Sequence, residues 1–129
     1  MTPGDVERCL RDYVAAVNAH DVPSILADRH PGATLTLMGA SPTVDTRDGL
    51  ERFYRQLFAA APGYRVAVDG GTYADDLGVL WGAVTDTSRP EAGPEVPAVF
   101  VCTFEEGRFR HDRVYADFTR LSALIGPGA

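Results

Sequence analysis

The spacing of the hydrophobic residues changes near residue 64, and this change constrains the fold more than any other feature of the chain. Before this point apolar residues recur at the spacing of one helix face. After it they alternate with polar residues, as in strands that bury one side. Helices that precede a run of strands predict an α+β domain in which the helices cover one face of a bent sheet.

Three helices are expected in the first part of the chain, over about residues 3–19, 21–28 and 46–60. Thr2 is placed to cap the first helix, with Pro3 in its first turn. "HPG" at 30–32 should end the second helix, and "ATLTLMG" at 33–39 alternates as a half-buried strand does.

Four strands are expected after the change of spacing, over residues 64–69, 77–87, 97–104 and 108–118. We interpret "GG" at 70–71 and "YADD" at 73–76 as turns. The segment "SRPEAGPEVP" at 88–97 is too rich in proline for a central strand, so it is expected to be an exposed loop. Sequential strands with short connections are expected to pair antiparallel.

Composition limits the class of protein. The chain has 129 residues, of which 45% are hydrophobic and 23% are charged, so we expect one domain spanning residues 1–129. A net charge of −6 repels phosphates and anionic lipids, and this argues against nucleic acid or membrane partners. A leader segment and a membrane span are not evident, which favours a cytoplasmic location.

Metal and redox chemistry have little support in the sequence. Cys9 and Cys102 are far apart among apolar neighbours, so both are expected to be reduced and to pack as small hydrophobes. The histidines are scattered, with no carboxylate cluster near them in the sequence. We therefore expect neither a metal site nor a cofactor.

The last expected strand carries the most informative pattern of side chains. Because side chains alternate, one face has His111, Arg113, Tyr115 and Asp117. The other face has Asp112, Val114, Ala116 and Phe118. The acid Asp117 then has two interpretations: it meets solvent or a dimer partner, or a local bulge turns it into the interior of the domain.

Two segments resemble a known family. "DYVAAVNAHDV" at 12–22 and "FEEGRFRHDRVYADFTRLSALIG" at 104–126, with the order of elements, resemble the nuclear transport factor 2-like superfamily. Within it they look most like the SnoaL-like polyketide cyclase group, of ketosteroid isomerase-like fold. This resemblance implies a cone-shaped, antiparallel or mixed sheet wrapped around three N-terminal helices (an α+β barrel). It also implies a pocket for a small apolar metabolite, and a homodimer.

The resemblance also implies site residues. Asp117 matches the general acid and base of the cyclases, and Tyr13 matches a helix tyrosine that orients an acid or stabilises an enolate. The pocket walls would include Trp81, Phe53, Tyr54 and Phe100, with further substrate contacts from His111, Arg113 and Tyr115.

Two departures from the family patterns bear on the reaction. The base of the steroid isomerases falls on Leu37, which cannot take a proton, and this excludes steroid isomerisation in its usual form. The histidine of the cyclases falls near Thr103. Two hypotheses remain: a cofactor-independent cyclase, isomerase or epoxide hydrolase that uses Asp117, and a noncatalytic ligand-binding or dimerisation module.

Overall fold

A five-stranded mixed sheet forms the centre of the molecule. The computed structural model describes residues 1–88 and 95–125. The sheet has the order β1-β5-β4-β3-β2, in which β1 runs parallel to β5 and the other neighbours pair antiparallel. The strands are β1 (Arg29–Leu37), β2 (Tyr64–Ala74), β3 (Leu77–Asp86), β4 (Val96–Glu105) and β5 (Arg108–Ala116). The expected α+β class and curved sheet are confirmed.

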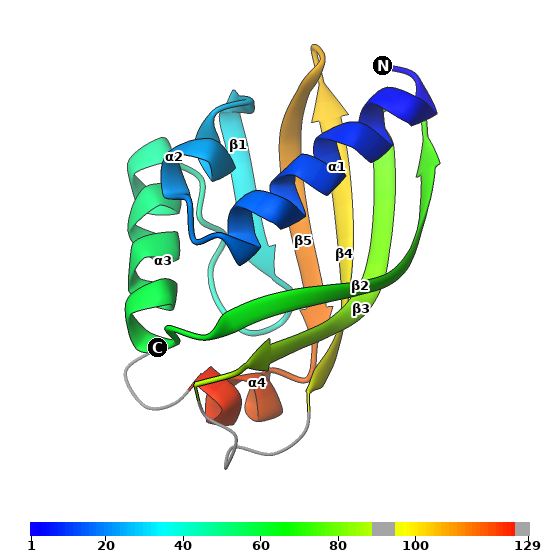
Figure 1. Ribbon diagram of the computed structural model, residues 1–129. Coiled ribbons are helices and arrows are strands. Elements are labelled where there is room, and N and C mark those ends of the chain that lie inside the picture. The colour runs from blue at the N-terminus through cyan, green and yellow to red at the C-terminus, as the bar shows by residue number, and fades with distance from the viewer. Residues whose placement is uncertain (89–94, 126–129) are drawn as a thin grey trace.

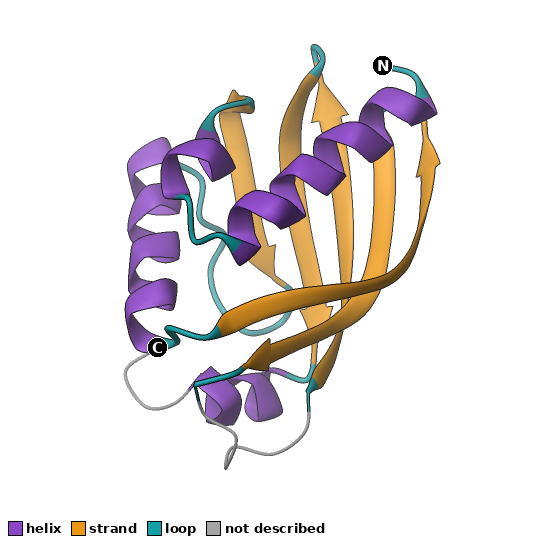
Figure 2. Ribbon diagram, viewed as in Figure 1, coloured by secondary structure: helices purple, strands orange, loops and turns teal. Residues whose placement is uncertain are grey.

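Helices cover one face of this sheet, and Figure 2 shows them on the viewer's side. They are α1 (Pro3–Asn18), α2 (Val22–Leu26), α3 (Arg47–Ala60) and α4 (Phe118–Ile125). Each of the first three helices has an N-cap residue whose side chain accepts a hydrogen bond from a backbone N–H in the first turn. These N-cap residues are Thr2, Asp21 and Thr46. None of the helices in the described ranges is long and apolar enough to cross a membrane.

Strands β2 and β3 are long and bend strongly, and their curvature closes the lower end of the cone in Figure 1. The prediction of a turn at Gly70 and Gly71 is wrong, because β2 continues through both glycines to Ala74. A bulge between Val68 and Gly70 bends the strand there. A Cβ atom on Gly70 would lie 2.6 Å from the indole of Trp81, so only glycine fits beneath that ring.

Two further boundaries differ from the prediction. Strand β1 begins at Arg29 and passes through the "HPG" segment with an irregular register, because the segment is held beside β5. The final strand ends at Ala116, and the apolar segment after it is helix α4. Much of the proline-rich loop predicted at 88–97 lies outside the described residues.

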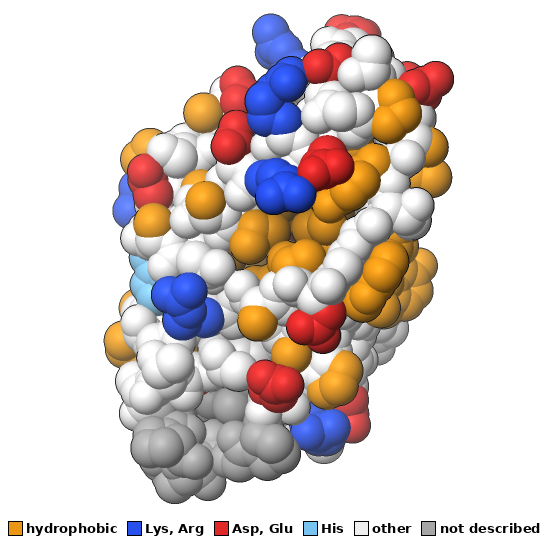
Figure 3. All heavy atoms as spheres, turned by 45° about the vertical axis from the view of Figure 1, so that its right-hand side comes forward, with side chains coloured by type: hydrophobic (Ala, Val, Ile, Leu, Met, Phe, Trp, Pro, Cys, Tyr) orange, Lys and Arg blue, Asp and Glu red, His pale blue; other side chains and the backbone are white. Residues whose placement is uncertain are grey.

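None of the helices in the described part of the chain covers the outer face of the sheet. Trp81, Val99 and Tyr115 are directly opposite one another across β3, β4 and β5. Their side chains are 44%, 37% and 44% exposed. Hydrophobic side chains along the right-hand edge of Figure 3 mark the side on which this outer face lies.

Candidate functional site

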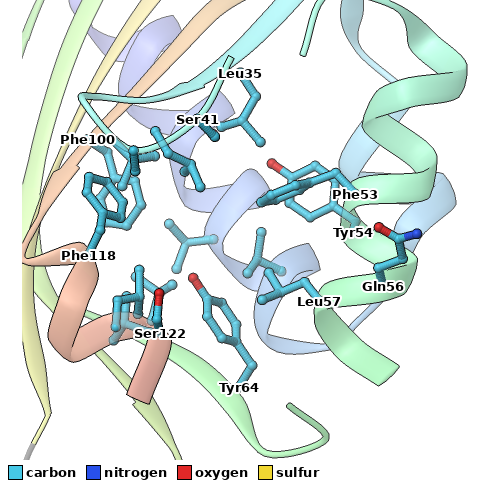
Figure 4. Close-up of a pocket in the computed structure, with 18 of the residues that line it drawn as sticks. Leu35, Ser41, Phe53, Tyr54, Gln56, Leu57, Tyr64, Phe100, Phe118 and Ser122 are labelled. Atoms are coloured by element: carbon cyan, nitrogen blue, oxygen red, sulfur yellow. The ribbon is translucent and has the colours of Figure 1, made fainter. Parts of the chain in front are cut away.

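An apolar pocket lies inside the cone, between the helices and the inner face of the sheet. Its volume is about 320 Å³, which is at the lower end of the range for small-molecule sites. Aliphatic and aromatic side chains form most of the wall, among them Leu35, Leu57, Leu80, Phe100 and Phe118. Figure 4 shows these walls and the two tyrosines, Tyr54 and Tyr64, whose hydroxyl groups point inward.

Tyr13 and Tyr54 connect the pocket to a buried carboxylate. The Tyr13 hydroxyl donates a hydrogen bond of 2.7 Å to Oδ2 of Asp112 and lies 3.0 Å from the Tyr54 hydroxyl. Nη2 of Arg29 donates to the Tyr54 oxygen at 3.3 Å. Both tyrosines line the pocket, so the pocket wall is linked by hydrogen bonds to one buried carboxylate and one buried guanidinium.

Asp112 is fully buried on the inner face of β5. Besides the Tyr13 hydroxyl, its carboxylate has the thiol of Cys102 as a neighbour, with Sγ 3.9 Å from Oδ1. Burial raises the pKa of Asp112, whereas Arg29 and the hydrogen bonds from Tyr13 and Cys102 oppose that rise. The carboxyl group is therefore a stronger proton acceptor than an exposed aspartate and is still stabilised as an anion.

Arg29 is the positive charge of this group and is 5% exposed. Its guanidinium carbon lies 4.2 Å from the centre of the Phe109 ring and 5.1 Å from that of Tyr13. Burial acts to lower the pKa of Arg29, but Tyr54, Tyr13 and Asp112 together raise it above its ordinary value. Arg29 therefore stays charged, although Nη1 has no hydrogen-bond partner among the described residues.

Burial also raises the pKa of each pocket tyrosine, most strongly that of Tyr13, where the charge of Asp112 adds to the effect. All three hydroxyls are neutral at physiological pH as a result. The Tyr64 hydroxyl points into the pocket and has no hydrogen-bond partner in the described part of the chain. It is available to a ligand.

The expectation that Asp117 lies in the pocket is wrong. Its side chain is exposed and accepts a hydrogen bond from the backbone N–H of Arg120, and its carbonyl accepts one from Leu121. This geometry makes Asp117 the N-cap of α4. A carboxylate in this position ends the strand and begins the helix, and it does not contact the pocket.

Four other predicted contacts also lie outside the pocket. Trp81, His111, Arg113 and Tyr115 lie on the outer face of the sheet. A bulge does occur in β5, but at Arg110, so the alternation from His111 onward is regular and keeps these side chains turned outward. By contrast, Phe53, Tyr54, Phe100 and Tyr13 line the pocket.

Asp112 and Arg29 were not among the predicted site residues. The alternation along the last strand already placed Asp112 on the same face as Val114 and Ala116, and an acid on an apolar face indicates a buried, partnered carboxylate. Arg29 gave no comparable signal. It follows a short helix in a polar segment, and only tertiary packing brings it against Tyr54.

The fold does bring carboxylates to one histidine, contrary to expectation. Single ligand atoms of His30, Glu105 and Glu106 lie within 4.8 Å of one another. The two glutamates are exposed, and Glu105 is already paired with Arg110, whose Nε lies 3.3 Å away. We assign no metal to this cluster because a neighbouring guanidinium opposes binding of a second cation.

These features define a cone-shaped α+β protein with an interior pocket of metabolite size. The chain belongs to the SnoaL-like domain family, whose model matches residues 10–111. A comparison with curated proteins gives no match.

Solved structures show the same fold at low sequence identity. Bal32a from a soil-derived mobile gene cassette is 15% identical with a TM-score of 0.83, covering 96% of this chain and 98% of its own. TerC, co-crystallised with polyporic acid, is 18% identical with a TM-score of 0.76 (94% and 97% covered). A candidate polyketide cyclase from Sinorhizobium meliloti is 18% identical with a TM-score of 0.72 (88% and 99% covered). At these identities the likeness concerns the fold alone.

Proposed function

We propose that the protein acts on a small, largely apolar metabolite in the cone pocket, without a cofactor, as an isomerase or cyclase that moves a proton through Tyr13. The observation that carries this proposal is the 2.7 Å hydrogen bond from Tyr13, at the pocket wall, to the buried carboxylate of Asp112. Isomerisation and ring closure that start from an enol or a phenol both depend on such proton transfers.

The proposed step moves two protons in one direction. The substrate O–H bond breaks as its proton passes to the Tyr13 oxygen, and the original Tyr13 proton passes to Asp112. Tyr13 remains neutral throughout, Asp112 becomes the neutral acid, and the substrate becomes an enolate or phenolate. Reversal of the two transfers returns the proton after the carbon skeleton has rearranged. In this proposal Asp112 takes the role that the family resemblance implied for Asp117.

Epoxide hydrolysis is supported less well. The polar residues of the pocket wall in the described ranges are tyrosines, serines and one glutamine. These groups can orient a ligand, but they do not activate water as a carboxylate in the wall would. The second candidate is a noncatalytic ligand-binding module, favoured by the apolar wall and by the position of Asp112 behind Tyr13.

Deuterium exchange into β-naphthol tests the proposal. Exchange at the ring carbon beside the hydroxyl requires loss of the hydroxyl proton, addition of a deuteron to that carbon, and loss of the original proton from the same carbon, which restores the aromatic ring. The wild-type protein should accelerate it, and Tyr13→Phe should lower the acceleration by about a hundredfold or more. Asp69→Asn, on an exposed position of β2, is the control and should leave the rate unchanged. Binding of β-naphthol without accelerated exchange would instead favour the ligand-binding module.

Asp117→Asn separates the two candidate acids. Asparagine keeps the N-cap of α4 and removes the titratable group, so exchange and binding should both be unchanged. Asp112→Asn, checked for a native circular dichroism spectrum, should abolish the acceleration. The opposite ranking of these two variants would restore Asp117 as the acid and contradict the relay through Tyr13.

A further inference from the structure

We infer that the polar end of the ligand is a hydroxyl group that donates its hydrogen to Tyr13 or Tyr54, so that the pocket selects phenols and enols over ketones and ethers of the same shape. The inference rests on the proposed use of this pocket for a metabolite. It follows from counting the hydrogens in the buried group formed by Arg29, Tyr54, Tyr13 and Asp112.

Each hydroxyl hydrogen in the group is already committed. An ionised carboxylate only accepts hydrogen bonds, so the single hydrogen of Tyr13 is directed at Asp112. Tyr13 then has none left for its contact with Tyr54, and Tyr54 must be the donor across that 3.0 Å contact. Arg29 can only donate, so the Tyr54 oxygen accepts from it.

In each hydrogen bond of this group the donor is therefore the partner on the Arg29 side and the acceptor is the partner on the Asp112 side. A hydroxyl oxygen has two acceptor positions, and in Tyr13 and Tyr54 one of the two is already filled. What each tyrosine can still offer to the pocket is an acceptor. A ligand hydroxyl matches this arrangement, whereas a ketone or ether oxygen would meet another oxygen with no hydrogen between them.

The direction in which these hydrogen bonds are donated depends on the charge of Asp112. The groups around Asp112 are Arg29, Tyr13, Tyr54 and Cys102. The Tyr13 hydroxyl, which donates to Asp112 at 2.7 Å, the Cys102 thiol and the nearby positive charge of Arg29 all favour the ionised carboxylate over the neutral acid. The assignment of donors therefore applies to the ionised form of Asp112. Tyr64 is not part of this hydrogen-bonded group, and its hydroxyl can donate to or accept from a second oxygen of the ligand.

Calorimetric titration with β-naphthol, its methyl ether and methyl β-naphthyl ketone tests the inference at neutral pH. The three probes share one ring system and differ in whether the oxygen donates a hydrogen. We expect β-naphthol to bind about tenfold more tightly than either analogue, the effect of one hydrogen bond against one unmatched oxygen. Equal or tighter binding of the ketone would overturn the inference.

The variant Arg29→Met/Asp112→Leu tests the cause of the selectivity. Removing both charges together avoids an unpaired buried charge, and the exchange for apolar side chains is compatible with a stable fold. A hydrogen of the tyrosine pair is then free to point into the pocket, so the preference for β-naphthol over the ketone should disappear. A preference that survives in this variant contradicts our assignment. Tyr13→Phe, which frees the hydrogen of Tyr54, provides a second route to the same loss.

These outcomes are separable from those of the exchange experiment. Selective binding without exchange leaves the inferred ligand class standing and rejects the catalytic proposal. Binding of none of the three probes rejects both.

Discussion

Asp112 and Arg29 are buried residues of opposite charge. They are linked by hydrogen bonds through the hydroxyls of Tyr13 and Tyr54 rather than by a direct ion pair. The guanidinium of Arg29 lies over the faces of the Phe109 and Tyr13 rings, and the carboxylate of Asp112 accepts hydrogen bonds from the Tyr13 hydroxyl and the Cys102 thiol. Burial raises the pKa of this carboxyl group, while Arg29, the Tyr13 hydroxyl and the Cys102 thiol favour its anionic form. This combination suits a group that must accept a proton and give it back.

The raised pKa of Asp112 predicts a specific pH dependence of stability. A carboxyl group whose pKa is higher in the folded state favours folding most below its unfolded value, near pH 3.8, and this contribution is lost as the pH rises through the native pKa. The free energy of unfolding of the wild type should therefore fall relative to that of Asp112→Asn as the pH rises from about 4 toward neutrality. The fall amounts to about 1.4 kcal/mol for each tenfold by which folding strengthens proton binding to Asp112. Urea titrations of both proteins measure it, and parallel curves would contradict it.

At the level of elements, the close approach of α1 to β3 positions Tyr13. Gly78 lies under this helix, where an added Cβ would be 2.4 Å from Cδ1 of Leu10 and 3.0 Å from Cγ1 of Val6. Both of those side chains are fully buried, so they have little room to move aside. The absence of a side chain at Gly78 is thus what allows α1 to lie flat against the sheet and to present Tyr13, one turn beyond Leu10, to Asp112.

Gly78→Ala should consequently lower the free energy of unfolding by about 1–3 kcal/mol, as overpacking of a tight core does. It should also weaken β-naphthol binding, because a displaced α1 moves Tyr13. Gly4→Ala is the matched control: its Cβ would meet only Thr2 at 3.8 Å, and alanine is the better helix former, so stability should rise by about 0.5–1 kcal/mol. Equal effects of the two substitutions would show that the contact with α1 is not the cause.

At the level of the whole molecule, the helices of the described residues cover one face of the sheet and leave the other, the bare face, exposed. Trp81, Val99 and Tyr115 form an apolar row across the bare face, with Leu77 and Val68 also exposed on the same sheet. Large apolar side chains arranged together on a regular surface are typical of an interface. We propose that a second copy of the chain covers this face in a twofold dimer.

Light scattering should then give twice the chain mass of 13.9 kDa at micromolar concentration. Val99→Glu places a charge in the middle of the apolar row and should yield the monomer with its fold intact. Ala59→Glu, at an exposed position of α3, should not change the mass. A wild-type mass equal to one chain would contradict the dimer.

The elements that depend on local spacing could be predicted from the sequence. Helical periodicity, together with the cap at Thr2, predicted the first three helices, and alternation predicted the late strands and the two faces of the last one. These signals are local, because periodicity and capping involve residues within one element. The spacing of a short apolar segment cannot by itself separate a strand from a helix, and for this reason the last expected strand was extended to residue 118, although β5 ends at Ala116 and α4 begins at Phe118.

Tertiary packing sets which face of the sheet the helices cover, and therefore which of the two acids, Asp112 or Asp117, lies inside the cone. The alternation of side chains along the last expected strand places Asp112 and Asp117 on opposite faces of the sheet. It does not indicate which of the two faces the helices cover. The hydrogen bond between Tyr13 and Asp112 joins residues 99 positions apart, and that between Tyr13 and Tyr54 joins residues 41 apart. Contacts of this kind are created where α1 packs over β2 and β3 and α3 packs beside β1, so no local pattern in the chain encodes them.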